Sequence, residues 1–249
     1  MNAIVPQLKP KSVAPAPIPD RAAIVQTFKM IVGDGNVTEL RALDASVNGD
    51  RWRSTISGYF DNGQALADAC MTITSAVGVY LVLNPILPDL LARSWNHIKR
   101  AKDADCTKDH DILRRRWLPI DVDAVRPSGI SSTDREHEAA QHRAGDIWSF
   151  IHDELGWGDP IEASSGNGAH LLYAIDMPTD DGGKVQKFLK MLSAKFSDSA
   201  VKVDTSVHNP ARIWRLYGTP ACKGDSIPSR PHRLSRILRA PREMLGGAA

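Results

Sequence analysis

Two aspartates stand inside an otherwise apolar, strand-like run, LPIDVDAV, at residues 118–125. Carboxylates avoid such places unless something compensates their charge. Alternate residues of a strand face the same side, so Asp121 and Asp123 project together. Like charges that close repel each other, and a divalent cation that prefers oxygen ligands, Mg²⁺ or Mn²⁺, relieves the repulsion. The alternative is a pair of exposed aspartates that form ion pairs with Arg114 to Arg116 or with Arg126.

A glycine-rich turn follows the aspartate pair. The stretch SSGNGAH, residues 164–170, contains Gly166 and Gly168, which permit backbone conformations that other residues resist. Such a turn presents N–H groups that can bind phosphate, and His170, at the start of the strand candidate HLLYAI, can bind or orient a phosphate. No Gly-Lys-Ser/Thr follows, so the turn is not a Walker loop. The alternative is an ordinary β-turn with a hydrogen-bonded histidine.

A third carboxylate lies on a later strand candidate, VKVDTSV. Val201 and Val203 alternate with polar residues, which puts Asp204 on the opposite face of a half-buried strand. Three carboxylates on one sheet face suit phosphoryl transfer with two metal ions, which lie about 3.5–4 Å apart and share ligands. Arg212 and Arg215 follow and suit phosphate groups, although a straight strand would turn them to opposite faces.

The three signals, in this order, resemble the motifs of the archaeo-eukaryotic primase superfamily. LPIDVDAVRPSG resembles its first motif, SSGNGAHLLY its second and KVDTSVHNPARIWRLYGTPACK its third. The likeness is strongest to the phage, plasmid and CRISPR-associated primase-polymerases and covers roughly residues 35–225. One departure is Gly168, where much of the superfamily has serine; Ser165 is the candidate to supply that hydroxyl.

The resemblance implies a DNA-dependent primase and polymerase that transfers nucleotides from NTPs or dNTPs to a 3′-hydroxyl on a single-stranded DNA template. It implies that Asp121, Asp123 and Asp204 are catalytic and hold two Mg²⁺ or Mn²⁺ ions. It implies that the nucleotide is bound by Ser165, Gly166, Asn167, Gly168, His170, Arg215 and Lys223. Further candidates for nucleic-acid contacts are Arg114, Arg115, Arg116, Arg126, Asn209 and Arg212. A helicase or other replication or CRISPR proteins are the expected protein partners.

The elements expected around these motifs predict an α+β fold. The N-terminal part mixes strands (VTELRALDA, STISGYF, VGVYLVLNP) with helices (RAAIVQTFKMIVG, NGQALADACMTITSA, PDLLARSWNHIKRA). The later part has the order β-α-β-α-β-β, close to an RRM-like sheet. We expect a disordered Pro-rich tail over residues 1–20, an N-terminal α/β module over 21–110, an RRM-like catalytic module packed against it over 111–225, and a basic C-terminal tail over 226–249.

Composition adds broad limits. Of the 249 residues 42% are hydrophobic and 24% charged, and no apolar run approaches the roughly 18 residues of a membrane helix. Three widely spaced cysteines argue against a disulfide framework and favour a reducing cytoplasm. The net charge is only +2, but residues 205–249 carry eight basic side chains against two acidic ones, and residues 93–116 carry eight against four. Such blocks suit either a polyanionic partner or a solvated surface.

Two other classes of function stay open. A D-x-D nucleotide-sugar transferase explains LPIDVD, but neither the glycine-rich turn nor Asp204. A non-catalytic single-strand-binding replication module suits the basic blocks, but three carboxylates on its binding face would repel a nucleic-acid backbone unless metals neutralise them. Smaller alternatives are a zinc site with His97, Cys106 and His110, a second carboxylate pair at Asp109 and Asp111, and base stacking by Trp52, Tyr59, Trp117 or Trp214.

Overall fold

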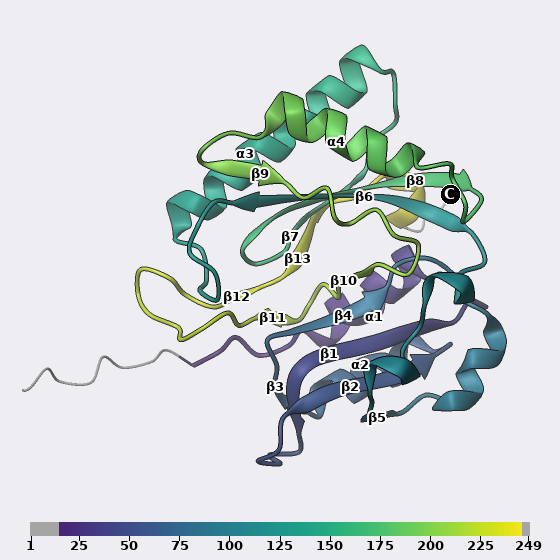
Figure 1. Cartoon of the computed structure of the whole chain (residues 1–249). Helices are drawn as coiled ribbons and strands as arrows, with labels where there is room; N and C mark the ends of the chain where they lie inside the picture. Colours follow the sequence, from purple (N-terminus) through teal and green to yellow (C-terminus); the bar gives the residue numbers. More distant parts are fainter. Residues whose placement is uncertain (1–14, 246–249) are drawn as a thin grey trace, which may run out of the picture.

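The computed structural model describes residues 15–245, in which helices and antiparallel sheets combine as the predicted α+β class requires (Figure 1). The α-helices are α1 (Arg21–Ile31), α2 (Gly63–Met71), α3 (Asp134–Ser149) and α4 (Lys184–Phe196), and a π-helical turn, Phe150–Glu154, extends α3. Short 3₁₀ turns occur at Pro88–Arg93, Asp103–Asp105, Asp109–Asp111 and Arg242–Leu245. Within the described part of the chain, no helix has the length and apolar character needed to cross a bilayer.

The first half of the chain builds most of a six-stranded antiparallel sheet. Its strands follow the order β10 (Ile213–Arg215), β4 (Gly78–Val82), β1 (Thr38–Val47), β2 (Ser54–Phe60) and β5 (Ile98–Arg100), and β3 (Ile73–Ser75) pairs with β1. Asp20 caps α1 by accepting a hydrogen bond from the Ala23 N–H at 3.0 Å. The buried side chains of Ile24 and Phe28 then join α1 to α2 and to the sheet core.

A βαββαβ unit forms the second, five-stranded sheet. It consists of β6 (Arg115–Ala124), α3, β7 (Ile161–Ser164), β8 (Gly168–Met177), α4 and β9 (Val201–Val203). The strand order is β13-β7-β8-β6-β9, in which β13 (Arg236–Arg239) adds an edge strand from the end of the chain. Figure 1 shows α3 and α4 together on the outer face of this sheet, away from the six-stranded sheet. The inner face of β6 and β8 therefore looks toward β4 and β10.

The structure differs from the expected domain division at both boundaries. β10 lies beyond residue 110 but pairs with β4, so the third motif is shared between the two sheets. Residues 226–245 are not a separate tail, because β12 (Arg233–Leu234) pairs with β11 (Pro220–Ala221) and β13 pairs with β7. Of the expected N-terminal tail, residues 1–14 lie outside the described residues.

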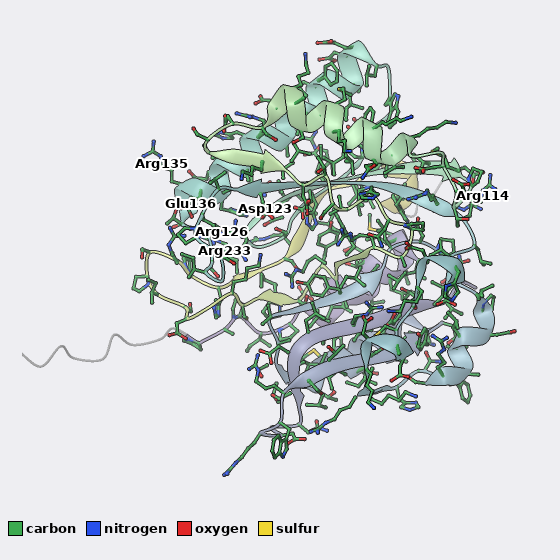
Figure 2. All side chains as sticks on the ribbon, viewed as in Figure 1. Arg114, Asp123, Arg126, Arg135, Glu136 and Arg233 are labelled. Atoms are coloured by element: carbon green, nitrogen blue, oxygen red, sulfur yellow. The ribbon has the colours of Figure 1, made fainter. Side chains whose placement is uncertain are left out.

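Three of the five arginines of this C-terminal segment are held by protein carboxylates. Arg230 donates to Glu136 at 2.8 Å and Arg233 to Asp134 at 2.6 Å, both in the first turn of α3 (Figure 2). Arg239 forms an ion pair with Glu162 at 3.2 Å. The sequence shows a basic block, but these partners, which lie far away in the sequence, neutralise much of it locally.

Two predicted helices are shorter than expected. The stretch PDLLARSWNHIKRA forms only the 3₁₀ turn Pro88–Arg93, and then β5. The helical backbone ends at Ser94 (φ −171°, ψ 79°), and the left-handed Asn96 (φ 54°) prevents it from resuming. The helix expected over residues 62–76 ends at Met71, and the β-branched pair Ile73 and Thr74 forms β3 instead.

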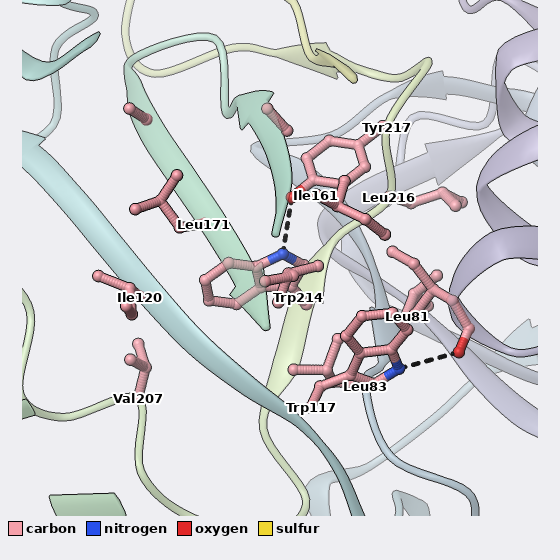
Figure 3. Packing of buried hydrophobic residues seen from close by; sticks show 14 of the residues in the cluster. Leu81, Leu83, Trp117, Ile120, Ile161, Leu171, Val207, Trp214, Leu216 and Tyr217 are labelled. Carbon is pink, nitrogen blue, oxygen red and sulfur yellow. Dashed lines mark hydrogen bonds between the residues drawn. The ribbon is translucent and has the colours of Figure 1, made fainter. Parts of the chain in front are cut away.

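One hydrophobic cluster continues through both sheets. Figure 3 shows Trp117 of β6 and Trp214 of β10 packed among Leu81 and Leu83 of the first sheet region. The Trp117 indole donates to the Ile31 carbonyl at 3.0 Å, which also ties β6 to α1. The shared core fixes the position of β10 relative to β6, and with it the groups that these strands present to each other.

A buried charge network supports β1. The Glu39 carboxylate is fully buried and accepts hydrogen bonds from Arg41 at 2.6 Å, from the Ser57 hydroxyl at 2.6 Å and from the Thr107 N–H at 2.8 Å. Burial opposes ionisation, but these donors outweigh it and hold the pKa of Glu39 below its ordinary value.

Glu39→Gln is expected to lower the free energy of unfolding near neutral pH by about 3 kcal/mol, because it leaves the Arg41 guanidinium buried without its counter-charge. Since the pKa of Glu39 is lower in the folded state, its contribution is present above the unfolded-state pKa and is lost as pH falls through the folded-state value. Urea unfolding of both proteins near neutral and at acidic pH measures the effect. If the two proteins differ in free energy of unfolding as much at acidic pH as near neutral pH, this account is contradicted. The Glu138→Gln substitution, at an exposed position, serves as the control.

Candidate active site

A cavity of about 260 Å³ lies where the inner face of the five-stranded sheet meets β4 and β10, and it collects side chains from all three predicted motifs. Its polar lining comprises Tyr80, Asp121, Asp123, Ser165, Asn167, His170, Asp204, Arg212, Arg215 and Lys223. Leu43, Val207, Ile213 and Trp214 complete the wall. Residues that are more than 100 positions apart in the sequence thus face one space.

Strand register places the carboxylates. On the paired strands β6 and β8, Asp121 lies opposite His170 and Asp123 lies opposite Gly168. Residues directly opposite in an antiparallel pair share a face, so both aspartates and the histidine look into the cavity. The Asp204 N–H, just after β9, donates to the Asp121 carbonyl at 2.9 Å, which brings the third aspartate beside the pair.

The two β6 aspartates have unequal proton affinities. The Asp121 carboxylate and burial together raise the pKa of Asp123 above its ordinary value. Burial acts to raise the pKa of Asp121 too, but the attraction of His170, Lys223 and Arg212 outweighs it and lowers that pKa. A like-charge pair of this kind is compensated only in part by its protein surroundings.

The donor chemistry fits a hard divalent cation. Asp121 Oδ1 is buried without a hydrogen-bond donor, and His170 Nε2 lies 3.5 Å away, an ion-pair distance rather than a hydrogen bond. Carboxylate oxygens on one face are the ligands that Mg²⁺ and Mn²⁺ prefer. In residues 15–245 no three His, Cys, Asp or Glu side chains are already grouped as metal ligands, because the Asp204 carboxylate accepts from the Ser206 N–H at 2.7 Å and hydroxyl at 3.0 Å. The Asp121–Asp123 pair is therefore the part of this arrangement that could hold a cation without rearrangement.

The glycine-rich turn differs from the expected phosphate cradle. The Ser164 hydroxyl accepts from the Gly166 N–H at 3.1 Å, and the Ser165 hydroxyl accepts from the N–H groups of Asn167 at 3.4 Å and Gly168 at 2.9 Å. The backbone donors are thus used inside the turn, and its contribution to the cavity comes from the side chains of Ser165 and Asn167. Gly166 has a φ of 90° and packs against Ala221, away from the cavity.

Gly168 is required by the close approach of β6. A Cβ at this position would lie 2.4 Å from the Val122 carbonyl and 3.0 Å from Asp123 Oδ1. The backbone contact explains why residue 168 is a glycine, and the Ser165 hydroxyl is committed to the turn.

Gly168→Ala is expected to lower the free energy of unfolding by about 1–3 kcal/mol, because the β6–β8 ladder must shift to relieve the clash. The shift would also displace Asp123. Thermal unfolding measures the loss, and Gly145→Ala in α3, where a Cβ meets nothing within 4 Å, should be neutral or stabilising. An equal change in Tm for Gly168→Ala and Gly145→Ala would contradict the proposed crowding between residue 168 and β6.

His170 is buried and held on three sides. Its Nδ1 lies 3.0 Å from the Tyr217 hydroxyl, and its ring centroid lies 4.0 Å from that of Trp214. Its Nε2 faces Asp121. The histidine is thus a rigid part of the cavity wall.

Cationic side chains form the opposite wall. The Arg215 guanidinium lies over the Tyr80 ring, 4.4 Å from its centroid, and donates to the Tyr80 hydroxyl at 3.1 Å. Arg215 is buried, and its Nε and Nη1 have no hydrogen-bond partner. Arg212 precedes β10, so the alternation of a straight strand does not apply to the two arginines and both line the cavity. Tyr80 was not predicted; its signal is a phenol in the apolar strand GVYLV.

Buried polar atoms without partners concentrate in this cavity. In residues 15–245, nine buried side-chain nitrogen and oxygen atoms lack a hydrogen-bond partner, and five of them belong to residues that line it. The five are Asp121 Oδ1, Asn167 Nδ2, Arg212 Nε, Arg215 Nε and Arg215 Nη1. Such atoms cost free energy unless a ligand satisfies them, so the cavity is suited to a polar ligand with both cationic and anionic parts.

Most side chains expected to contact nucleic acid have protein partners elsewhere. Arg114 and Arg116 pair with Asp176, and Figure 2 shows Arg114 at the far end of the sheet from Asp123. The buried Arg115 donates to the carbonyls of Thr179 and His208, and Asn209 donates to Asp109. The side chain of Arg126 is also buried and lies 3.5 Å from Asp123 Oδ1, so it supports that aspartate. Among the six candidates, only Arg212 lines the cavity.

Most of the smaller alternatives, with the exception of base stacking by the exposed Trp52, find structural explanations. Cys106 is buried whereas His97 and His110 are exposed, which does not suit a zinc site. Asp109 accepts from the Ala211 N–H at 2.8 Å and Asp111 from the Lys108 N–H at 2.8 Å, so both aspartates serve local structure. Tyr59, Trp117 and Trp214 are core residues, and Trp52 is 74% exposed.

Comparison with protein-family models and with curated proteins finds no match. Among solved structures, the chain is similar to the AEP domain (PP-N190) of the primase-polymerase (PrimPol) of cyanophage S-2L. The TM-score is 0.48 and the sequence identity 15%, with 92% of this chain and 98% of that chain covered. A likeness of this size does not assign a function, which has to rest on the residues of the cavity.

Proposed function

We propose that this chain is a template-directed nucleotidyltransferase, a DNA-dependent primase-polymerase of the archaeo-eukaryotic primase superfamily. It would join NTPs or dNTPs to a 3′-hydroxyl and would also initiate primers. The observation that carries the proposal is the cavity itself, where the residues of three separate sequence motifs meet around unsatisfied polar atoms. The βαββαβ unit, with strand order β7-β8-β6-β9, has RRM-like connectivity, which supports the same reading.

The charges of the cavity complement a metal-bound triphosphate. Asp121, Asp123 and Asp204 would hold two Mg²⁺ or Mn²⁺ ions. When bound, these ions would neutralise phosphate charge and lower the pKa of the attacking 3′-hydroxyl. A nucleotide without metal would meet three carboxylates and be repelled. A metal without nucleotide would leave the opposite, cationic wall unsatisfied.

The side chains of the cationic wall would orient the triphosphate. The unpartnered Nε and Nη1 of Arg215 offer charged donors to phosphate oxygens on two sides of the guanidinium, and the Tyr80 ring fixes the plane of the guanidinium. Arg212 and the half-buried Lys223 add positive charge where the leaving pyrophosphate develops negative charge. His170 would bind a phosphate oxygen beside Asp121. Holding the nucleotide rigidly beside the primer end supplies much of the rate in phosphoryl transfer.

The remaining expectations are part of the proposal. Single-stranded DNA template and primer would be the macromolecular ligands, and a helicase or other replication or CRISPR proteins would be partners in a prokaryotic, phage or plasmid cytoplasm.

Primer extension with the full chain, Mn²⁺ and single dNTPs on four templates that differ in the next base tests the proposal. The expected result is incorporation of the complementary nucleotide, together with synthesis on a bare single strand. Metal-independent DNA binding without incorporation would instead support the non-catalytic module, and transfer from a nucleotide sugar without nucleic acid would support the D-x-D transferase. The exposed pair Asp34→Asn plus Asp89→Asn is the control for substitutions at the aspartate pair.

A further inference from the structure

His170 belongs to a short chain of hydrogen bonds that leads away from the cavity into the core. The Trp214 Nε1 donates to the Tyr217 hydroxyl at 2.8 Å (Figure 3), and that hydroxyl lies 3.0 Å from His170 Nδ1. On the other side of the ring, Nε2 lies 3.5 Å from Asp121 Oδ1. Trp214, His170 and Tyr217 are all buried.

With a neutral His170 ring, one arrangement of protons satisfies every donor along this chain. An indole N–H can only donate, so the Tyr217 oxygen accepts from Trp214. A phenol keeps its own proton near neutral pH, so the Tyr217 hydroxyl also has a proton to donate. In the described residues, the Tyr217 hydroxyl has no partners other than Trp214 and His170, which leaves Nδ1 as the acceptor of that proton. A ring nitrogen that accepts a hydrogen bond carries no proton, and the proton of the neutral ring is then on Nε2.

We propose that Tyr217 is a positioning residue that fixes His170 as the Nε2–H tautomer, with a donor rather than a lone pair directed to Asp121 and the cavity. The opposite tautomer would direct the Nε2 lone pair toward the Asp121 carboxylate and would leave the phenol proton without an acceptor. The tautomer follows from the hydrogen bonds alone. Its use, donation from Nε2–H to a phosphate oxygen, rests on the proposed function.

Two variants separate positioning from packing. Tyr217→Phe removes the donor to Nδ1, so the ring is expected to populate both tautomers. In nucleotide transfer, the KM for the nucleotide should rise about tenfold, the lower end of the loss known for the orienting partners of metal-bound histidines, with a smaller change in kcat. Trp214→Phe removes the indole donor but leaves the Tyr217 proton directed at Nδ1. The His170 tautomer in this variant should therefore match that of the wild type.

Long-range ¹⁵N NMR of the full chain without nucleotide, at mildly alkaline pH, reads the tautomer directly, with His170→Gln to assign the signals. The expected wild-type spectrum has a pyrrole-like Nε2 and a pyridine-like Nδ1. A pyrrole-like Nδ1 would overturn the proposal even if neither variant folds, and so would an unchanged single tautomer in folded Tyr217→Phe. The expected spectrum without nucleotide transfer would uphold the tautomer and count against the proposed function, so the two failures are distinguishable.

Discussion

Replacement of Asp121 and Asp123 together by asparagine is expected to lower the rate of nucleotide transfer at least about 1,000-fold. The loss corresponds to about 4 kcal/mol of transition-state stabilisation, within the range that bound divalent metals supply. The structural reason is that these two carboxylates share one face of β6 and could hold a cation without rearrangement. Primer extension under single-turnover conditions measures the rate constant.

Asp123→Asn alone should stabilise the protein in the absence of metal. Asp121 raises the pKa of Asp123, so ionisation of Asp123 costs free energy that a neutral amide does not, whereas His170, Lys223 and Arg212 favour the ionised form of Asp121. A gain of about 1 kcal/mol corresponds to a Tm about 2–4 °C higher for a chain of this size. Mn²⁺ should raise the Tm of the wild-type protein and leave that of the double variant unchanged, because only the wild type keeps both carboxylates that would bind the ion in the folded state.

This opposition between activity and stability distinguishes a metal site from a structural pair. Differential scanning fluorimetry with and without MnCl₂ gives the Tm values, with Asp34→Asn plus Asp89→Asn as the matched control. An Asp123→Asn variant that loses stability, or a double variant that keeps its Mn²⁺ response, would contradict the role given to these carboxylates.

Arg215→Met is expected to raise the KM for the nucleotide about 100-fold. Two N–H groups of the guanidinium are buried without partners, and hydrogen bonds to charged groups are worth about 1.5–3 kcal/mol each. Stability without nucleotide should change little, because the lost contacts with Tyr80 are offset by removal of a buried charge that has no carboxylate partner.

Steady-state kinetics with varied nucleotide, together with thermal unfolding, tests this prediction. Arg114→Met is the control, since Arg114 pairs with Asp176 at the far end of the sheet. A large fall in Tm with an unchanged KM would show that Arg215 serves the fold rather than the nucleotide.

Local sequence patterns predict the parts of this site that depend on local rules. The alternation of a strand is enough to place Asp121 and Asp123 on one face. The amphipathic spacing of KVQKFLKMLSAKF likewise predicts a helix, and α4 spans these 13 residues. Helix α1 begins at Arg21, directly after the predicted N-terminal tail of residues 1–20, because Asp20 caps it.

Other features depend on contacts between distant strands and cannot be predicted in the same way. Tyr80 reaches the cavity only because β10 pairs with β4, and Tyr217 meets His170 only because the two sheets share a core. The basic C-terminal segment resembles a tail in composition because its partners, such as Glu136, lie in a helix about 90 residues earlier. In the glycine-rich turn, the serine hydroxyls compete for the N–H groups that the motif alone would offer to phosphate.

The most direct test is a crystal structure of the chain with Mn²⁺ and a non-hydrolysable dNTP, with an anomalous difference map at the manganese edge. We predict manganese peaks bound by Asp121 and Asp123, with the Asp204 carboxylate turned from Ser206 toward the metal and the triphosphate on Arg215. Manganese elsewhere, or a triphosphate bound away from Arg215 with Asp204 still on Ser206, would contradict the assignment of this cavity as a nucleotidyl-transfer site.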